Sequence, residues 1–130
     1  MTAKERCYLL IMPSGRMEIR TFDSGKEDVN DVLHRELNGG FYEIVRPFTL
    51  PHKFLVMVDD CGLLKDLEYN HIASEIYGQR KHGGVIVGPA VIMREDFVDG
   101  EPDIVGLTYE DVEELVDSMK RIIVITEVRE

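Results

Sequence analysis

The sequence predicts one α+β domain over residues 1–130, with a mostly antiparallel β-sheet and two main helices and one short helix packed against it. Three observations predict this class. The segments with strand character are joined by gaps too short for βαβ crossovers, which favours antiparallel hairpins. Two longer segments repeat apolar residues at helical spacing. A chain of 130 residues, 44% of them hydrophobic, can supply the core of a compact two-layer body.

The first segments predict a β-hairpin. Residues 6–12 are apolar and rich in strand-forming residues, and the Pro-Ser-Gly of residues 13–15 predicts a tight turn. Residues 16–22 then alternate, with Met17 and Ile19 on one face and charged residues on the other. Because the period is two, we expect a half-buried strand.

The segment after the hairpin predicts the first main helix. Ser24 and Glu27 stand at the spacing of a capping box, in which each side chain satisfies a backbone donor of the other. Asn38-Gly39-Gly40 supplies left-handed conformations that end a helix. The apolar stripe of this helix consists of Val29, Val32, Leu33 and Leu37.

Four further segments have strand character. Residues 41–48 predict a strand that Pro47 ends or places at a sheet edge. Residues 54–60 predict a nearly continuous apolar strand, and residues 63–67 a short returning strand. Residues 85–93 predict a strand interrupted at Gly88-Pro89. A bulge, a bend and an edge position remain the alternatives for that interruption.

The last third predicts an acidic loop followed by the second main helix. Residues 96–106 are expected to form the loop. Thr108 and Asp111 have the spacing of a capping box at the helix start. Residues 122–128 suit either a strand or more helix, and we favour helix to about residue 123 and then an extended tail. The helix core stripe consists of Val112, Leu115, Val116, Met119, Ile122 and Ile123.

Negative charge is concentrated in one segment. The chain carries −10, and residues 94–118 hold ten acids against one base, a net −9 that leaves −1 for the rest. A protein that binds the phosphate backbone needs the opposite sign, so direct nucleic-acid binding is disfavoured. The ten acids are Glu95, Asp96, Asp99, Glu101, Asp103, Glu110, Asp111, Glu113, Glu114 and Asp117.

Several other classes are also disfavoured. No apolar run approaches the roughly 18 residues of a membrane span, and the apolar start is too short for a signal peptide. We therefore expect a cytoplasmic protein in which Cys7 and Cys61 stay reduced. The histidines lack metal-ligand spacing. Glycines of residues 83–88 open a strand instead of a helix, so no phosphate loop is expected.

No catalytic constellation is present in the sequence. A Gly-x-Ser-x-Gly elbow is missing, and the carboxylates beside Cys61 disfavour a reactive thiolate. We expect no cofactor, no metal and no catalytic residue, and leave an enzyme as an open third possibility.

The segment "NHIASEIYG", residues 70–78, has two interpretations. The structural one makes Asn70 the N-cap of a short helix that Gly78 ends. The functional one makes Asn70 and Tyr77 line a ligand pocket whose rim carries Arg80 and Lys81. An Arg-Lys-His cluster in a glycine-flanked loop can bind an anion, but it is more often a solvated loop tip.

Residues 54–78, "FLVMVDDCGLLKDLEYNHIASEIYG", with the following "GVIVGPAVIM" and "GLTYEDVEELVDSMK", resemble the bacterial and phage family called domain of unknown function 3846. The resemblance covers roughly residues 40 to 120. Pro89 departs from the family pattern, which has a polar residue there. The resemblance implies a small α+β domain carried by phages and mobile elements, with no known activity. The matching residues are Asp59, Gly62, Asn70, Ala73, Tyr77, Gly78 and Gly88.

Two functional hypotheses follow. The first is a non-enzymatic binding module for a small anionic ligand or a partner protein, with the ligand site at Asn70, Tyr77, Arg80 and Lys81. The alternative is an acidic, nucleic-acid-mimicking anti-defence protein that covers a basic surface with residues 94–118. A homodimer is expected if the strand with Gly88-Pro89 lies at a sheet edge.

Overall fold

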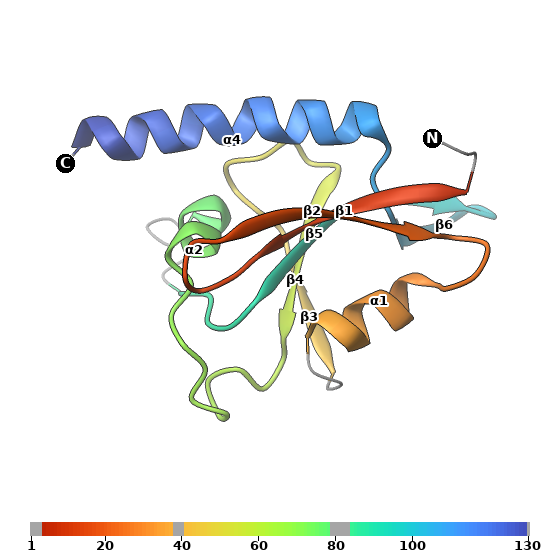
Figure 1. The fold of residues 1–130 in the computed structure, drawn as a ribbon, viewed down its shortest axis with the longest axis horizontal. Coiled ribbons are helices and arrows are strands. Elements are labelled where there is room, and N and C mark those ends of the chain that lie inside the picture. The colour runs from red at the N-terminus through yellow and green to blue at the C-terminus, as the bar shows by residue number, and fades with distance from the viewer. Residues whose placement is uncertain (1–3, 38–40, 79–83, 130) are drawn as a thin grey trace.

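The computed structural model describes residues 4–37, 41–78 and 84–129, with residues 123–129 described by their backbone alone. The described chain forms one antiparallel sheet of six strands with three helices (Figure 1). The strands are β1 (Glu5–Ile11), β2 (Met17–Asp23), β3 (Tyr42–Val45), β4 (Phe54–Asp59), β5 (Ala90–Val98) and β6 (Glu101–Val105). The helices are α1 (Val29–Glu36), α2 (His71–Tyr77) and α4 (Tyr109–Arg129).

Strand β5 is the centre of the sheet, whose order is β2-β1-β5-β4-β3. Its first half pairs with β1 on one side and β4 on the other, and its second half pairs with β6 on the β1 side. Cys7 of β1 and Leu107 exchange two backbone hydrogen bonds of 2.7 Å, so β6 is followed at once by a second contact with β1. The predicted α+β class with an antiparallel sheet is confirmed.

Helices cover both faces of this sheet, so the expected two-layer body is in fact three-layered. Helix α1 packs on one face, and α2 and α4 pack on the other. On β4, Phe54, Val56 and Val58 contact the α2–α4 side, whereas Leu55 and Met57 contact the α1 side. A strand buried on both faces has a continuous apolar sequence, which explains the unbroken run in β4.

Helix α1 begins one turn later than the sequence indicated. Asp28 is the N-cap, and its side chain and that of Asp31 form the capping box, with N–H to oxygen distances of 2.8 and 3.0 Å. The expected cap Ser24 instead donates to the backbone oxygen of Lys4 at 2.7 Å. The expected stop at residues 38–40 lies outside the described residues.

Helix α4 starts as predicted and ends later than predicted. The backbone N–H of Asp111 donates to Thr108 Oγ1 at 3.2 Å, and the Thr108 N–H donates to Asp111 Oδ2 at 2.9 Å. The helix then continues to Arg129, so the expected extended tail after residue 123 is wrong. Each residue added to an existing helix gains a hydrogen bond and avoids the cost of helix nucleation. This gain outweighs the low helix propensity of the β-branched residues in this segment.

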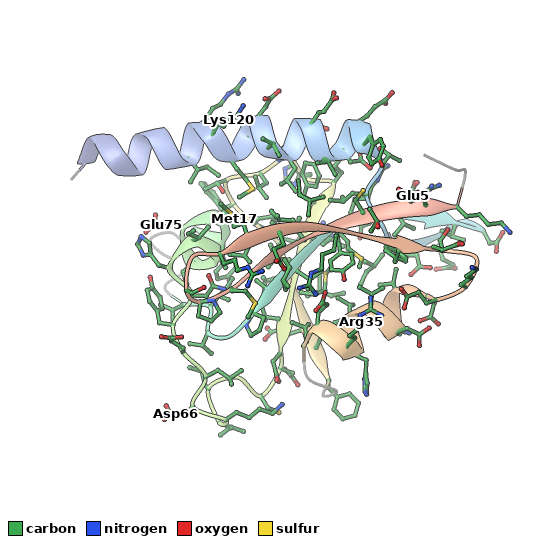
Figure 2. The ribbon with its side chains drawn as sticks, viewed as in Figure 1. Glu5, Met17, Arg35, Asp66, Glu75 and Lys120 are labelled. Atoms are coloured by element: carbon green, nitrogen blue, oxygen red, sulfur yellow. The ribbon has the colours of Figure 1, made fainter. Side chains whose placement is uncertain are left out.

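The predicted acidic loop is a β-hairpin. Val98 pairs with Glu101 across a two-residue turn, in which Asp99 and Gly100 have φ of 53° and 81°. Asp-Gly is a strong signal for such a turn, because both positions need positive φ. Conversely, the strand expected at residues 63–67 is a series of turns, and Figure 2 shows Asp66 at the tip of this loop.

The Gly88-Pro89 interruption is a bend just before β5. Gly88 has φ of +76°, and a Cβ there would come within 2.7 Å of Leu67 Cδ1, so only glycine fits. The edge alternative is wrong because β5 lies in the middle of the sheet. The condition set for a homodimer along this strand is therefore not met.

None of the helices among the described residues is long and apolar enough to cross a membrane.

A buried carboxylate joins α4 to the centre of the sheet. Asp111, 3% exposed, accepts from Lys53 Nζ at 3.0 Å and from Arg94 Nη1 at 3.1 and 3.2 Å. Burial acts to raise the pKa of the Asp111 carboxyl. The hydrogen bonds from Thr108, Lys53 and Arg94 outweigh it and hold the pKa below its ordinary value of 3.8.

This lowered pKa predicts a stability loss in acid. The folded pKa lies below the unfolded value, so the contribution of Asp111 is fully present above about pH 3.8 and is lost as the pH falls through the folded pKa. We expect Asp111→Asn to be less stable at neutral pH and to show a shallower decline in this acidic range. Urea denaturation at a series of pH values measures it, with Asp60→Asn, an exposed carboxylate, as control. Equal slopes for wild type and Asp111→Asn would contradict the assignment.

Candidate functional site

Asn70, the centre of the predicted ligand site, is a fully buried structural residue. It is 0% exposed, and its Oδ1 accepts from the Ala73 N–H at 3.1 Å, which confirms the N-cap of α2. Its Nδ2 donates to the backbone oxygens of Ile11 at 3.0 Å and Gly88 at 2.8 Å. Both amide hydrogens and the side-chain oxygen are therefore engaged within the protein.

Tyr77, the other predicted ligand residue that the structure describes, is not brought together with Asn70. Tyr77 is half-buried at the opposite end of α2, about 10 Å from Asn70 along the helix axis. Gly78 closes α2 in the left-handed conformation with φ of 89°, as predicted. Arg80 and Lys81 lie outside the described residues. A ligand site of these four residues stays a prediction.

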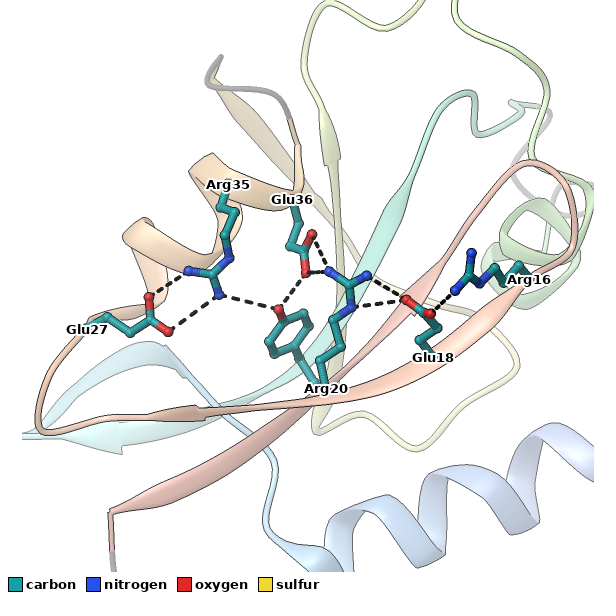
Figure 3. Close-up of polar contacts among 7 residues, drawn as sticks. Arg16, Glu18, Arg20, Glu27, Arg35 and Glu36 are labelled. Carbon is teal, nitrogen blue, oxygen red and sulfur yellow. Dashed lines mark hydrogen bonds and ion pairs between the residues drawn. The ribbon is translucent and has the colours of Figure 1, made fainter.

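Arginines gather beside α1, where all of them are paired. Three arginines alternate with three glutamates around the Tyr8 hydroxyl in one continuous network (Figure 3). Arg20 Nη1 donates to Glu36 at 2.8 Å, and Tyr8 donates to the same carboxylate at 2.5 Å. Burial, then the hydrogen bond to Glu36, raises the pKa of the Tyr8 hydroxyl. The network links Glu27, Arg35, Tyr8, Glu36, Arg20, Glu18 and Arg16 in that order.

This network is electrically balanced. Arg16, Arg20 and Arg35 carry three positive charges, and the three glutamates carry three negative ones. A hollow of about 250 Å³ beside the network is lined by these arginines, but each guanidinium already has a carboxylate partner. The network therefore ties α1 to β2, and an anion binding here would have to displace a glutamate.

A larger hollow of about 590 Å³ lies where the start of α1 meets β6 and the start of β1. Gly106 brings these elements together, because a Cβ there would come within 2.6 Å of the Arg6 Cβ. The charged residues that line this hollow are mostly acidic, with four carboxylates against two guanidinium groups. These charged residues are Glu27, Asp28, Asp96, Asp103, Arg6 and Arg94.

Two of these carboxylates oppose each other. Asp96 of β5 is the direct cross-strand partner of Asp103 of β6. Like charges placed directly opposite on a sheet are destabilising. Arg94 compensates only in part, because its Nη2 is 3.6 Å from Asp96 while its Nη1 contacts the buried Asp111. Asp103 has no ion pair within the described part of the chain.

The acidic segment is thus divided by the fold. Four of its ten acids hold basic residues: Glu95 with Arg46, Asp96 with Arg94, Glu114 with Lys53, and Asp111 with both Lys53 and Arg94. The remaining six are exposed and have no ion pair among the residues described. In Figure 1 the β6 hairpin and the first turns of α4 lie at the same end of the molecule. These six are Asp99, Glu101, Asp103, Glu110, Glu113 and Asp117.

Sequence reasoning located these acids but missed the hollow. The Asp96–Asp103 register depends on the Asp-Gly turn, and the Asp-Gly dipeptide was the available signal. The contribution from α1 and Gly106 had no sequence signal, because those residues meet β6 only through the sheet.

Comparison with known proteins gives the fold and no more. No family model matches the chain and no curated protein sequence matches it, so the resemblance to the domain of unknown function 3846 family stays a hypothesis. Among solved structures, a crystal structure of the small RNA methyltransferase HEN1 matches with a TM-score of 0.54 and 16% identity. The match covers 94% of this chain and 16% of the HEN1 chain. The likeness is to a segment of that larger enzyme.

Substitutions at Asn70 test whether it caps α2 only or also bridges the sheet. Asn70→Asp keeps an oxygen that can cap α2 but loses both hydrogen bonds to the carbonyls of Ile11 and Gly88. Asn70→Ala loses all three side-chain hydrogen bonds. Because each leaves buried carbonyls unpaired, we expect both variants to lose on the order of 3 kcal/mol of unfolding free energy.

Urea denaturation followed by circular dichroism measures this loss. The control is Asn30→Ala, in which an exposed amide that accepts from the Tyr42 hydroxyl is removed. It should cost less than about 1 kcal/mol. An Asn70→Asp variant as stable as the wild type would show that capping alone accounts for the residue.

Proposed function

We propose that this protein is a non-enzymatic binding module whose acidic hollow receives a basic side chain of a partner protein. The single observation that carries the proposal is the Asp96–Asp103 pair, two carboxylates opposed across strands at the hollow. Their repulsion is relieved when a cation enters between them. Neutralisation by a partner thus makes binding favourable at this place.

The size and lining of the hollow fit a lysine or arginine side chain. About 590 Å³ exceeds what one side chain fills, so the hollow has room for the neighbouring backbone of a bound segment. The aromatic residues Phe22 and Tyr42 belong to the lining, and aromatic rings attract cationic groups over their faces. The four carboxylates of the lining outnumber its two guanidinium groups, so the charged lining favours a cation over an anion.

The anionic-ligand version of the hypothesis is supported less well. The described hollow with several arginines is the small one at Arg16, Arg20 and Arg35, and every one of them is paired with a glutamate. Its net charge leaves little to attract an anion.

A nucleic-acid mimic is the second candidate, favoured by the six exposed carboxylates on the β6 hairpin and α4. In that case the basic partner is a nucleic-acid-binding protein, and the acids of α4 take part in the contact. Quadruple neutralisation of Glu110, Glu113, Glu114 and Asp117 would then weaken binding and its salt dependence. If the hollow alone binds, those four changes have little effect.

An NMR titration tests the proposal. The probe is a glycine-serine peptide with one central arginine, and its control is the same peptide with uncharged citrulline. We expect amide shifts confined to residues 94–106 and the start of α1 with arginine and none with citrulline. Asp96→Asn/Asp103→Asn should weaken binding by about tenfold, the loss expected for charge-assisted hydrogen bonds.

A matched double variant controls for general charge. Asp66→Asn/Glu68→Gln removes the same number of negative charges from exposed positions in the loop before α2, and neither residue lines the hollow. It should bind the arginine peptide as the wild type does. Equal weakening in both double variants, or shifts scattered over the whole surface, would show attraction by net charge alone and overturn the proposal.

A further inference from the structure

Among the described residues, strand β2 has no neighbouring strand on its outer side. The strand order of the sheet ends with β2 on one side and β3 on the other. Strand β6 is outside this order and pairs with the second half of β5. Edge strands are normally short or carry proline, which prevents pairing with other chains. β3 has four residues and is followed by Pro47, and β6 contains Pro102. β2 has seven residues and no proline.

The backbone groups on the open side of β2 belong to its odd-numbered residues. Met12 donates to the oxygen of Arg16, and Ser24 donates to that of Lys4, so the even-numbered residues of β2 are the ones bonded to β1. Cys7 of β1 accordingly bonds to Leu107 on its other side. In an antiparallel ladder, the residues between the hydrogen-bonded ones direct their backbone N–H and C=O groups away from the partner strand. The N–H and C=O groups of Met17, Ile19 and Thr21 therefore face the open edge.

The same three residues share the α4 face of the sheet. They pair with Cys7, Leu9 and Ile11, which are buried on that face. Yet Met17 is 38% and Ile19 50% exposed. They border an apolar hollow of about 310 Å³ shared with Val116 and Met119 of α4, and Figure 2 shows Met17 on this side of β2.

We propose that a second copy of this chain pairs with β2 in antiparallel fashion, with the two-fold axis at Ile19. In this register Ile19 meets Ile19 of the second copy, and Met17 meets Thr21. On the opposite face Glu18 stands directly across from Arg20 of the second copy, twice by symmetry. The Glu18–Arg20 pairs are at non-hydrogen-bonded positions, where the side chains of opposite residues approach most closely. The edge is thus complementary to itself in hydrogen bonding, charge and apolar surface.

The charge pattern selects this register over its neighbours. An axis at Thr21 would pair Arg20 with Phe22 and leave Glu18 without an arginine across from it. An axis at Met17 would bring Glu18 opposite Arg16 but would run half the pairing into the turn of residues 12–16. An axis at Glu18 would oppose the two Glu18 carboxylates, and an axis at Arg20 would oppose the two Arg20 guanidinium groups.

The Arg20 side chain is held in place for this contact. Glu36, whose side chain is 8% exposed, binds Arg20 Nη1 at 2.8 Å, and Glu18 binds Arg20 Nη2 at 2.6 Å. A side chain ordered before association loses less entropy on binding. None of these residues belongs to the acidic hollow, so the dimer does not rest on the proposed function.

Light scattering on size-exclusion fractions tests the dimer. Wild type should elute at about twice 14.9 kDa over a concentration series. Glu18→Arg and Arg20→Glu each place like charges across the axis and should elute as monomers with unchanged circular dichroism. Their mixture restores opposite charges in both pairs and should give a mixed dimer. A monomeric wild type, or a mixture no better associated than its components, would overturn the proposal.

Cysteine cross-linking tests the register. Hydrogen-bonded partners have Cα atoms about 5.5 Å apart, within disulfide range. Ile19→Cys should give a disulfide-linked dimer on a non-reducing gel. Thr21→Cys should not, because the two copies of Thr21 lie about 14 Å apart in this register. Wild type, with Cys7 buried and Cys61 half-buried, controls for native thiols. Cross-linking by Thr21→Cys in preference to Ile19→Cys would refute the register even if a dimer forms.

Discussion

The buried side chain of Asn70 is the constraint on which the rest of the architecture depends. It joins the end of β1 at Ile11, the bend before β5 at Gly88, and the first turn of α2 at Ala73. These three segments are far apart in sequence, and each presents a backbone group that would otherwise be buried without a partner. Only an amide offers two donors and an acceptor in the required arrangement, so one residue aligns the centre of the sheet with its covering helix.

A second tie acts in the middle of β5, at Arg94. Asp111 gathers Lys53 of the connection to β4, Arg94 of β5 and the first turn of α4. Asn70 ties the residues just before β5 and Asp111 ties its middle, and the β5–β6 hairpin extends beyond the second tie. Asp96 and Asp103 lie on this extension.

Charge has two separate uses in this molecule. Beside α1 it is balanced, and the network from Glu27 to Arg16 runs as one chain of alternating charges through Tyr8. At the hairpin it is left unbalanced, with Asp96 and Asp103 in register. The sequence already separates the two regions, because residues 16–36 mix four bases with six acids while residues 94–106 hold five acids and one base. Strand pairing and helix packing then decide which of these charges meet.

Local sequence patterns were enough to predict the α+β class, the first hairpin, the caps at Asn70 and Thr108, and the position of the negative charge. These features follow from local rules: period, turn chemistry and short-range capping. Tertiary structure alone decided that both sheet faces are covered, that β5 is central, and that Asn70 is buried. It also decided which acids pair with bases and which edge is open. Each of these depends on contacts between segments tens of residues apart, and no local pattern encodes the partner of such a contact.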